Sequence, residues 1–316
     1  MSMSFQSINA GYNATFNENK LSLGLVVPLV NYAHSSVPTM HQQIERIQLA
    51  EKLGFAAVWL RDVPFNVPSF GDAGQVYDPF VYLGVLSAMT SKIALGVASM
   101  VLPLRHPAHV AKSAASVDQL SNGRLILGIA SGDRPDEYPA MNIPFDDRGS
   151  RFRDSYEYIR KSWKNASQFT NQYGELGNDL DILPKPVNGR FPMLITGSSQ
   201  QNETWLTQNG DGFITYPRTL HTQEQIINRW RQLSSKFGQV SKPVMQPLYI
   251  DIQDDDNAPM EPIHLGFRSG VVALKEYLLA LETIGVNHVA LNLRFNQMPI
   301  NKTLQRIADQ LLPLFK

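Results

Sequence analysis

The sequence predicts an α/β protein built as a single (β/α)8 TIM barrel. From residue 21 to the C-terminus, apolar runs of strand length alternate with amphipathic runs of helix length, and eight such pairs can be read. The run at residues 93–102 is almost continuous in apolar and small side chains, which is typical of a parallel strand buried on both faces. The 316 residues are an ordinary length for one barrel, and no shift in composition marks a second domain.

The expected strands are short apolar runs bounded by polar residues, glycine or proline. In chain order they are residues 21–27, 56–60, 93–102, 124–129, 191–196, 212–216, 244–252 and 288–293. The expected helices carry apolar positions on one face. They are residues 40–53, 79–89, 107–120, about 147–168, 202–208, 223–237, 271–284 and a closing helix that ends at Leu314.

Three residues stand where a helix N-cap is expected, namely Thr39, Asp78 and His106. Two connecting segments are longer than the rest. The polar segment at residues 170–189 is expected to leave the barrel and to hold a short hairpin, and residues 254–269 are expected to form a loop.

The composition excludes several classes of function. Lysine plus arginine equals aspartate plus glutamate, 28 each, so no nucleic-acid or anionic-membrane partner is expected, because either would need a basic surface. The absence of cysteine excludes disulfides, cysteine-held metals and thiol nucleophiles, and it agrees with a cytoplasmic location. Residues 1–20 are polar and lack the apolar core of a signal peptide, so we expect an arm or extra surface element outside a barrel domain of residues 21–316.

The most informative segment runs from residue 78 to residue 133. It contains Asp-Pro-Phe at 78–80, Thr-Ser-Lys-Ile-Ala-Leu-Gly at 90–96, Leu-Pro-Leu-Arg-His-Pro at 102–107, Asp-Gln-Leu-Ser-Asn-Gly-Arg at 118–124 and Leu-Gly-Ile-Ala-Ser-Gly at 127–132. In combination these runs resemble the bacterial luciferase-like flavin-dependent monooxygenases. The order of strands and helices extends the resemblance over about residues 21–316. The resemblance implies a luciferase-like TIM barrel whose active site opens at the C-terminal ends of the strands.

The third strand has the composition of one wall of a flavin pocket. Small residues occupy its middle, where β-branched and aromatic side chains are commoner, and small side chains let a planar ring approach the backbone. The resemblance implies a non-proline cis peptide against the flavin, and the matching bond joins Ala98 to Ser99. The alternative is that these small residues only fill a narrow barrel interior.

Two further elements match the family's flavin-phosphate site. The segment after the fourth strand is Ala130, Ser131, Gly132 and Asp133, in which Ser131 and the Asp133 amide match phosphate-contacting positions of the family and Ser131 stands in place of the luciferases' arginine. Arg134 comes next and could supply the missing positive charge, because a guanidinium suits a phosphate bidentately. After the fifth strand they are Gly197, Ser198, Ser199 and Asn202, since a glycine and hydroxyls before a helix can bind an anion. The alternatives are a solvated surface position for Arg134 and plain helix capping for the serines and Asn202.

The catalytic group is harder to identify. Arg61 and Asp62 end the second strand, where barrel enzymes carry catalytic side chains, but Val63 stands where many family members have a histidine. The alternative for the two charged residues is an Arg61–Asp62 ion pair at the rim. Arg268 and Arg294 could hold an anionic substrate or form ion pairs at the rim. The histidines lack carboxylate partners at metal-ligand spacing, so no metal site is expected.

The resemblance implies an FMN-dependent oxidoreductase of the two-component monooxygenase type. Its partners would be reduced flavin from a separate flavin reductase, O2 and a small organic substrate, and the family implies a homodimer. Two alternatives stay open: a deazaflavin-dependent hydride-transfer enzyme on the same barrel, and a flavin-binding protein without turnover.

Overall fold

A computed structural model describes residues 5–164, 168–177, 180–238 and 240–315. Its centre is a closed barrel of eight parallel strands, in which each strand pairs with the next and the last pairs with the first. The strands are β1 (Ser22–Val26), β2 (Ala57–Leu60), β3 (Ala94–Val101), β4 (Leu125–Ala130), β7 (Met193–Thr196), β8 (Gly212–Ile214), β9 (Val244–Ile252) and β12 (His288–Asn292). All eight lie within two residues of their predicted bounds, so the predicted TIM barrel is confirmed.

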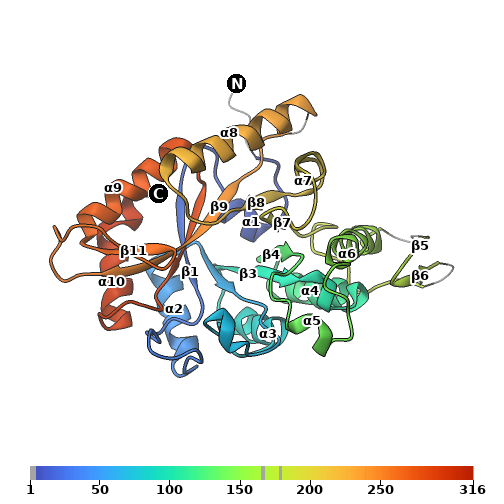
Figure 1. Ribbon diagram of the computed structural model, residues 1–316, viewed down its shortest axis with the longest axis horizontal. Coiled ribbons are helices and arrows are strands. Elements are labelled where there is room, and N and C mark those ends of the chain that lie inside the picture. Colours follow the sequence, from blue (N-terminus) through green and yellow to red (C-terminus); the bar gives the residue numbers. More distant parts are fainter. Residues whose placement is uncertain (1–4, 165–167, 178–179, 239, 316) are drawn as a thin grey trace.

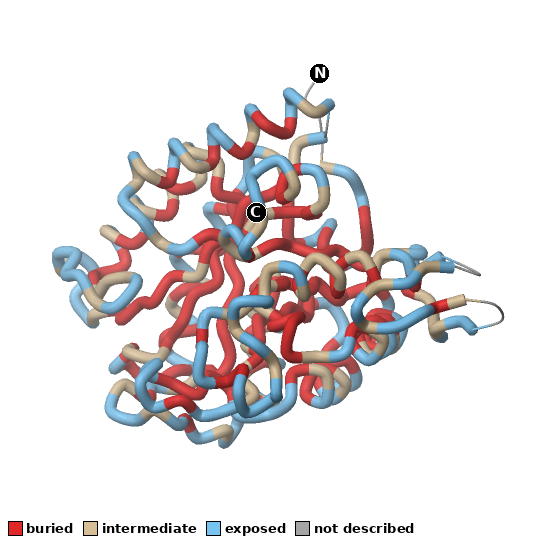
Figure 2. The backbone as a smooth tube through the Cα atoms, turned by 45° about the vertical axis from the view of Figure 1, so that its right-hand side comes forward, coloured by how far each residue is buried: buried red, intermediate tan, exposed pale blue. Residues whose placement is uncertain are grey.

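Eight helices surround the barrel in the described part of the chain (Figure 1). They are α2 (Gln43–Leu53), α3 (Pro79–Met89), α4 (Pro107–Leu120), α6 (Arg148–Ser162), α7 (Glu203–Asn209), α8 (Leu220–Lys236), α9 (Val271–Ile284) and α10 (Ile300–Gln310). Figure 2 shows the consequence for burial, with buried chain concentrated in the central strands and exposed chain on the outer helices and loops. None of the helices in the described residues is both long enough and apolar enough to cross a membrane.

The predicted helix starts are correct in two cases and wrong in one. The Asp78 carboxylate accepts the N–H groups of Phe80 and Val81, and the His106 ring accepts the N–H of Ala108, so both caps are confirmed. Thr39 is not a cap, because α2 begins only after Gln42, whose φ of 57° lies outside the right-handed helical region.

Two helices end earlier than predicted. The helix expected to reach residue 168 ends at Ser162, because the chain enters the hairpin β5 (Phe169–Asn171) and β6 (Gly174–Leu176). That hairpin was predicted and is confirmed. The closing helix α10 ends at Gln310 and continues as the 3-10 turn η3 (Leu312–Phe315).

The segment expected as a loop at residues 254–269 contains a second hairpin, β10 (Glu261–Ile263) and β11 (Gly266–Ser269). Strand β9 has nine residues and extends past the barrel rim. Its last four residues therefore have a free edge, with which β11 pairs in parallel. The prediction missed this pairing because the free edge of β9 exists only in the folded barrel.

The N-terminal segment is not the arm or surface element that we expected. Helix α1 (Ala10–Thr15) lies against β3 and β4, and the side chains of Ile8, Tyr12 and Phe16 are buried in the barrel's interior cluster. The Asn9 amide donates to the Asp118 carboxylate at 3.0 Å. Residues 8–16 pack against the barrel because their apolar side chains complete its interior.

Candidate active site

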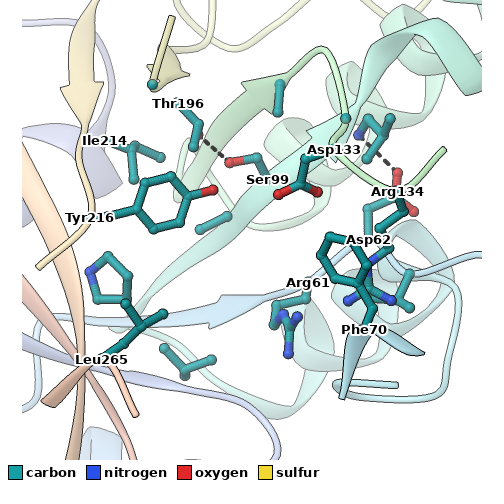
Figure 3. A pocket seen from close by; sticks show the side chains of 18 of the residues that line it. Arg61, Asp62, Phe70, Ser99, Asp133, Arg134, Thr196, Ile214, Tyr216 and Leu265 are labelled. Carbon is teal, nitrogen blue, oxygen red and sulfur yellow. Dashed lines mark hydrogen bonds between the residues drawn. The ribbon is translucent and has the colours of Figure 1, made fainter. Parts of the chain in front are cut away.

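A cavity of about 760 Å³ opens at the C-terminal ends of the barrel strands (Figure 3). Every barrel strand, or the loop directly after it, contributes to its lining. One such residue from each strand in chain order is Val26, Arg61, Ser99, Ala130, Thr196, Ile214, Tyr249 and Asn292. Binding sites for small molecules have volumes of roughly 300–1,000 Å³, so this cavity is large enough for a cofactor and a substrate fragment.

Strand β3 forms one wall of the cavity. The pairing of β3 with β4 shifts register between Val97 and Met100, and the Ala98–Ser99 peptide bond is cis, as the family resemblance implies. Both residues line the cavity, and the Ser99 hydroxyl is hydrogen-bonded to the Thr196 hydroxyl.

The small residues of this region have two functions. At Gly96 a Cβ atom would lie 2.3 Å from the Trp59 ring, so this glycine makes room for packing inside the barrel. On β4, a Cβ at Gly128 would lie 2.4 Å from the Val97 carbonyl oxygen, so only glycine allows β3 and β4 to approach here. Space-filling by small residues therefore explains Gly96, whereas Ala98 borders the cavity.

The loop after β4 brings all its predicted site residues to the cavity. The lining residues are Ala130, Ser131, Gly132, Asp133 and Arg134. The Ser131 carbonyl accepts the Tyr138 hydroxyl, which holds the start of this loop. Arg134 is buried rather than solvated, and its Nη2 donates to the Asp72 carbonyl at 3.3 Å.

The loop after β7 forms another part of the lining. Gly197, Ser198 and Ser199 line the cavity, and the Ser199 hydroxyl donates to the Thr196 carbonyl at 2.8 Å. Asn202 does not line the cavity. Its Oδ1 accepts the Trp205 N–H at 2.9 Å, so Asn202 caps helix α7.

The charged residues at the end of β2 do not pair with each other. Asp62 is buried, and its carboxylate contacts the Arg105 guanidinium at 2.7 Å and the Val101 N–H at 3.0 Å. Arg61 pairs instead with Asp72. An Arg61–Asp62 rim pair is therefore wrong, because each residue has a nearer partner contributed by another segment.

Asp72 was not predicted from the sequence. Its carboxylate contacts Arg61 through one oxygen and Arg294 through the other, the latter at 2.6 Å. Burial alone would raise the pKa of Asp72, but the two guanidiniums hold it below its usual value. Arg294 lines the cavity, whereas Arg268 pairs with Asp251 at 2.8 Å and does not.

Glu137 was missed as well. It lies in the short helix α5 (Glu137–Ala140), lines the cavity and is buried, and its Oε1 has no hydrogen-bond partner in the described structure. Burial raises the pKa of Glu137 to about 7, although Arg134 opposes this shift. The position of Glu137 in the segment after β4 could have identified it from the sequence, because enzymes of this fold carry reactive groups in the loops that follow the barrel strands.

These features define a class of protein: a TIM barrel with a cavity at the C-terminal ends of its strands, small residues on one wall and titratable groups around it. A comparison with family models identifies the family. The luciferase-like monooxygenase model matches residues 21–288, and the chain belongs to this family.

Curated relatives agree with this assignment. An uncharacterised protein of Mycobacterium bovis is 31% identical over 196 residues, which are 57% of this chain and 69% of the relative. The oxygenase component of the flavin-dependent trigonelline monooxygenase of Acinetobacter baylyi is 26% identical, over 68% of this chain and 60% of that protein.

Solved structures share the fold at low sequence identity. The monooxygenase RslO1 of Streptomyces bottropensis superposes with a TM-score of 0.78 at 18% identity, over 93% of this chain and all of that one. An F420-dependent secondary alcohol dehydrogenase gives 0.76 at 17% identity, over 94% and 99%. The oxygenating constituent of the 3,6-diketocamphane monooxygenase of Pseudomonas putida, in complex with FMN, gives 0.74 at 15% identity, over 94% and 99%.

Proposed function

We propose that the protein is an FMN-dependent monooxygenase of the two-component type, which uses reduced flavin and O2 to oxidise a small organic substrate. The observation that carries the proposal is the cavity at the strand ends, bordered by Ala98 and Ser99 on β3 and by the hydroxyl-rich loop after β7. Family membership and the flavin-dependent trigonelline relative support it.

The residues present fit such a cofactor. Ala98 leaves space for a flat ring beside β3. Gly197 has a φ of 54°, a conformation that glycine adopts easily, and it turns the chain at the end of β7 just before Ser198 and Ser199. We propose that Ser131, Gly132, Ser198 and Ser199 hold the phosphate, since hydroxyls and backbone N–H groups donate well to phosphate oxygens. When bound, reduced FMN would supply the electrons that activate O2.

The residues of the chain itself would bind and orient the cofactor and the substrate and would shield them from water. The barrel interior below the cavity is closed by apolar side chains, among them Met245 and Ile214, which exclude water from that side. Glu137 can hold or release a proton near neutral pH, because its pKa is raised to about 7 and it borders the cavity. We propose Glu137 as the proton-handling group, with Arg61 and Asp62 fixing the rim around it.

A deazaflavin-dependent hydride transfer is the second candidate. It is favoured by the similarity to the F420-dependent alcohol dehydrogenase, whose TM-score is close to that of the monooxygenase RslO1. Both cofactors present a flat tricyclic ring, so the β3 wall suits either.

We also propose a homodimer formed through α3. Val81, Val85 and Met89 follow one another at four-residue spacing on this helix, and their side chains are exposed. A row of exposed apolar residues on one helix face is typical of a protein–protein contact. Replacing Val81 and Val85 by glutamate should give a monomer in sedimentation velocity, whereas an unchanged sedimentation coefficient would exclude this interface.

Titration of the purified protein with FMN, riboflavin and F420, followed by absorbance and fluorescence, tests the proposed function. FMN should bind more tightly than either of the others, and the loaded protein should consume O2 when a flavin reductase supplies electrons. Tighter binding of F420 would favour the second candidate. FMN binding without turnover of any small organic substrate would indicate a flavin-binding protein without catalysis.

A further inference from the structure

Three arginine side chains meet at one edge of the cavity around a single buried carboxylate. Arg61 and Arg294 each contact one oxygen of the Asp72 carboxylate, and Arg134 donates to the Asp72 backbone carbonyl at 3.3 Å. All four residues line the cavity. We call Arg61, Arg134 and Arg294 the arginine cluster.

The cluster holds more donors than the protein satisfies. Nη1 of Arg134 and Nε of Arg294 are buried, and neither has a hydrogen-bond partner among the described residues. Arg134 as a whole is only 6% exposed, so water reaches it poorly. Both nitrogens are enclosed by the protein, so an anion in the cavity would meet the cluster through the more exposed parts of Arg61 and Arg294, whose side chains are 25% and 13% exposed.

Nearby acids do not balance the charge. Asp72 supplies one negative charge against three guanidiniums. Asp62 is already bonded to Arg105, and Asp133, which also lines the cavity, adds one further negative charge that solvent partly screens because the residue is exposed. Glu137 is only partly ionised at neutral pH, because burial raises its pKa to about 7. The edge of the cavity therefore keeps an excess of positive charge.

Aromatic rings lie beside the cluster. The Arg134 guanidinium stacks over Phe70 at 4.8 Å from the ring centre, and Arg294 lies 5.3 Å from the centre of Phe295. Tyr249 contacts the Phe295 ring, with 5.4 Å between centres. Phe70, Phe295 and Tyr249 all line the cavity, so a ring-sized apolar body could be held next to the positive charge.

The cluster lies apart from the loop after β7, which supplies Ser198 and Ser199 to the proposed phosphate site. In Figure 3, Thr196 and Tyr216 lie at one side of the pocket, Arg61, Arg134 and Phe70 lie at another, and Ser99 and Asp133 stand between them. An anion bound by the arginines would thus sit apart from one bound by the loop after β7.

We propose that the arginine cluster binds the negatively charged group of the substrate, and that the substrate is a small organic anion, a carboxylate or sulfonate, with a ring-sized apolar body. This inference rests on the proposed function for the presence of a substrate and a separately bound cofactor. It assigns Arg134 to the substrate and not to the cofactor phosphate, for which its position close to Ser131 had made it a candidate.

Isothermal titration calorimetry with matched probes tests the assignment. Benzoate and benzenesulfonate carry the anionic group, and benzamide has nearly the shape of benzoate without its charge. The wild-type protein should bind benzoate at least about tenfold more tightly than benzamide, since a charge-assisted hydrogen bond is worth about a tenfold change or more. Arg134→Gln should remove most of this preference, and Arg134→Lys, which keeps the charge but loses the planar fork, should remove part of it.

The matched control is Arg229→Gln, since Arg229 is an exposed arginine paired with Glu203, and neither residue lines the cavity. It should leave benzoate binding unchanged, and thermal melting should show that each variant is folded. Equal binding of benzoate and benzamide by the wild type would overturn the proposal, and so would equal benzoate affinities for Arg134→Gln and Arg229→Gln.

Titrations with FMN and riboflavin distinguish the two sources of an anion. If Arg134→Gln weakens FMN but not riboflavin, the cluster binds the cofactor phosphate and the substrate assignment is wrong. Unchanged FMN affinity together with lost benzoate preference supports it. If no flavin binds while benzoate is still preferred over benzamide, the anion site stands and the proposed flavin-dependent function fails.

Discussion

The Asp62 carboxylate and the Arg105 guanidinium form a two-point ion pair, with Nη2 at 2.7 Å from one oxygen and Nε at 3.1 Å from the other. Asp62 also accepts the N–H of Val101, the last residue of β3. Its side chain is 1% exposed. The residue that strand position indicated as catalytic thus connects the end of β2 to the end of β3, and each of its oxygens is occupied by a protein donor.

Replacing Asp62 should therefore lower stability. Asp62→Asn keeps an acceptor for Val101 but leaves Arg105 without its buried partner, which we expect to cost about 2–4 kcal/mol in the free energy of unfolding measured with urea. Asp78→Asn is the matched control, because Asp78 contacts the same guanidinium at 2.9 Å but is largely solvated, and asparagine is still a good N-cap. It should cost less than about 1 kcal/mol. Unchanged stability of Asp62→Asn with lost turnover would instead support a catalytic role.

Local sequence patterns were sufficient to predict the barrel. The strand at residues 244–252 and the helix at residues 271–284 were predicted with the bounds they have in the structure, because hydrophobic periodicity and flanking glycines determine them locally. The features that were missed depend on distant partners. Asp72 acquires its role from Arg294, which lies 222 residues away in the chain, and no spacing rule connects the two.

The same reason explains the N-terminal segment. Residues 8–16 carry Ile8, Tyr12 and Phe16 among small and polar residues, and only the open end of a finished barrel gives Tyr12 a place to be buried. The cavity residues were predicted where they follow strand ends, as at 130–134 and 197–199. Cavity residues were missed where long loops supply them. Examples are Asp72 and His264, whose ring contacts that of Tyr249.

The contribution of α1 can be measured at Tyr12. Its ring is buried and its hydroxyl donates to the Asp211 carbonyl at 2.9 Å. Tyr12→Ala should lower the free energy of unfolding by about 3–5 kcal/mol, as for other large buried aromatic residues. Tyr12→Phe should cost only about 1 kcal/mol, the value of one hydrogen bond. Wild-type stability of Tyr12→Ala in urea denaturation would show that α1 does not stabilise the barrel.

His288 makes stability depend on pH. It is fully buried, its Nε2 accepts the Trp59 indole N–H at 2.9 Å, and burial lowers its pKa from 6.5 to about 3. Between these two values the unfolded chain binds a proton that the folded chain excludes. Stability from this group is therefore fully present above pH 6.5 and is lost as the pH falls toward 3, by about 2 kcal/mol at pH 5.

The comparison with His288→Gln isolates this effect. Glutamine can accept the Trp59 N–H but does not titrate. Between pH 6.5 and pH 4 the free energy of unfolding of His288→Gln should therefore fall less steeply than that of the wild type, and the two slopes should differ by about 1.4 kcal/mol per pH unit. The measurement is urea denaturation of both proteins across this range. Parallel pH profiles would mean that the folded protein accommodates a charged His288.

Ala98 should control flavin binding without controlling folding. Its side chain borders the cavity, so Ala98→Leu would fill space that we propose for the cofactor. We expect FMN affinity to fall at least about tenfold, with a stability change below the roughly 1–3 kcal/mol that overpacking a filled core costs. Ala94→Leu is the control, because Ala94 is completely buried in the barrel's interior cluster and should destabilise the barrel. If both variants bind FMN like the wild type, the flavin does not lie against β3.

Ser198 and Asn202 separate phosphate binding from helix capping. Ser198 lines the cavity, and its hydroxyl accepts only a long 3.4 Å contact from the Gln200 N–H, so its proton is available to a phosphate oxygen. Ser198→Ala should weaken FMN about tenfold and leave riboflavin and stability unchanged, since it removes one hydrogen bond to a charged group.

Asn202→Ala should do the reverse. The Asn202 amide oxygen caps α7 by accepting the Trp205 N–H, and removing an N-cap costs about 1 kcal/mol of stability. FMN affinity should change less than about twofold, because the side chain is not part of the cavity lining. Calorimetry with FMN and urea denaturation give the two readouts for both variants. Weaker FMN binding by Asn202→Ala than by Ser198→Ala would mean that the capping residue contacts the phosphate when the cofactor binds, and that the loop after β7 rearranges to allow it.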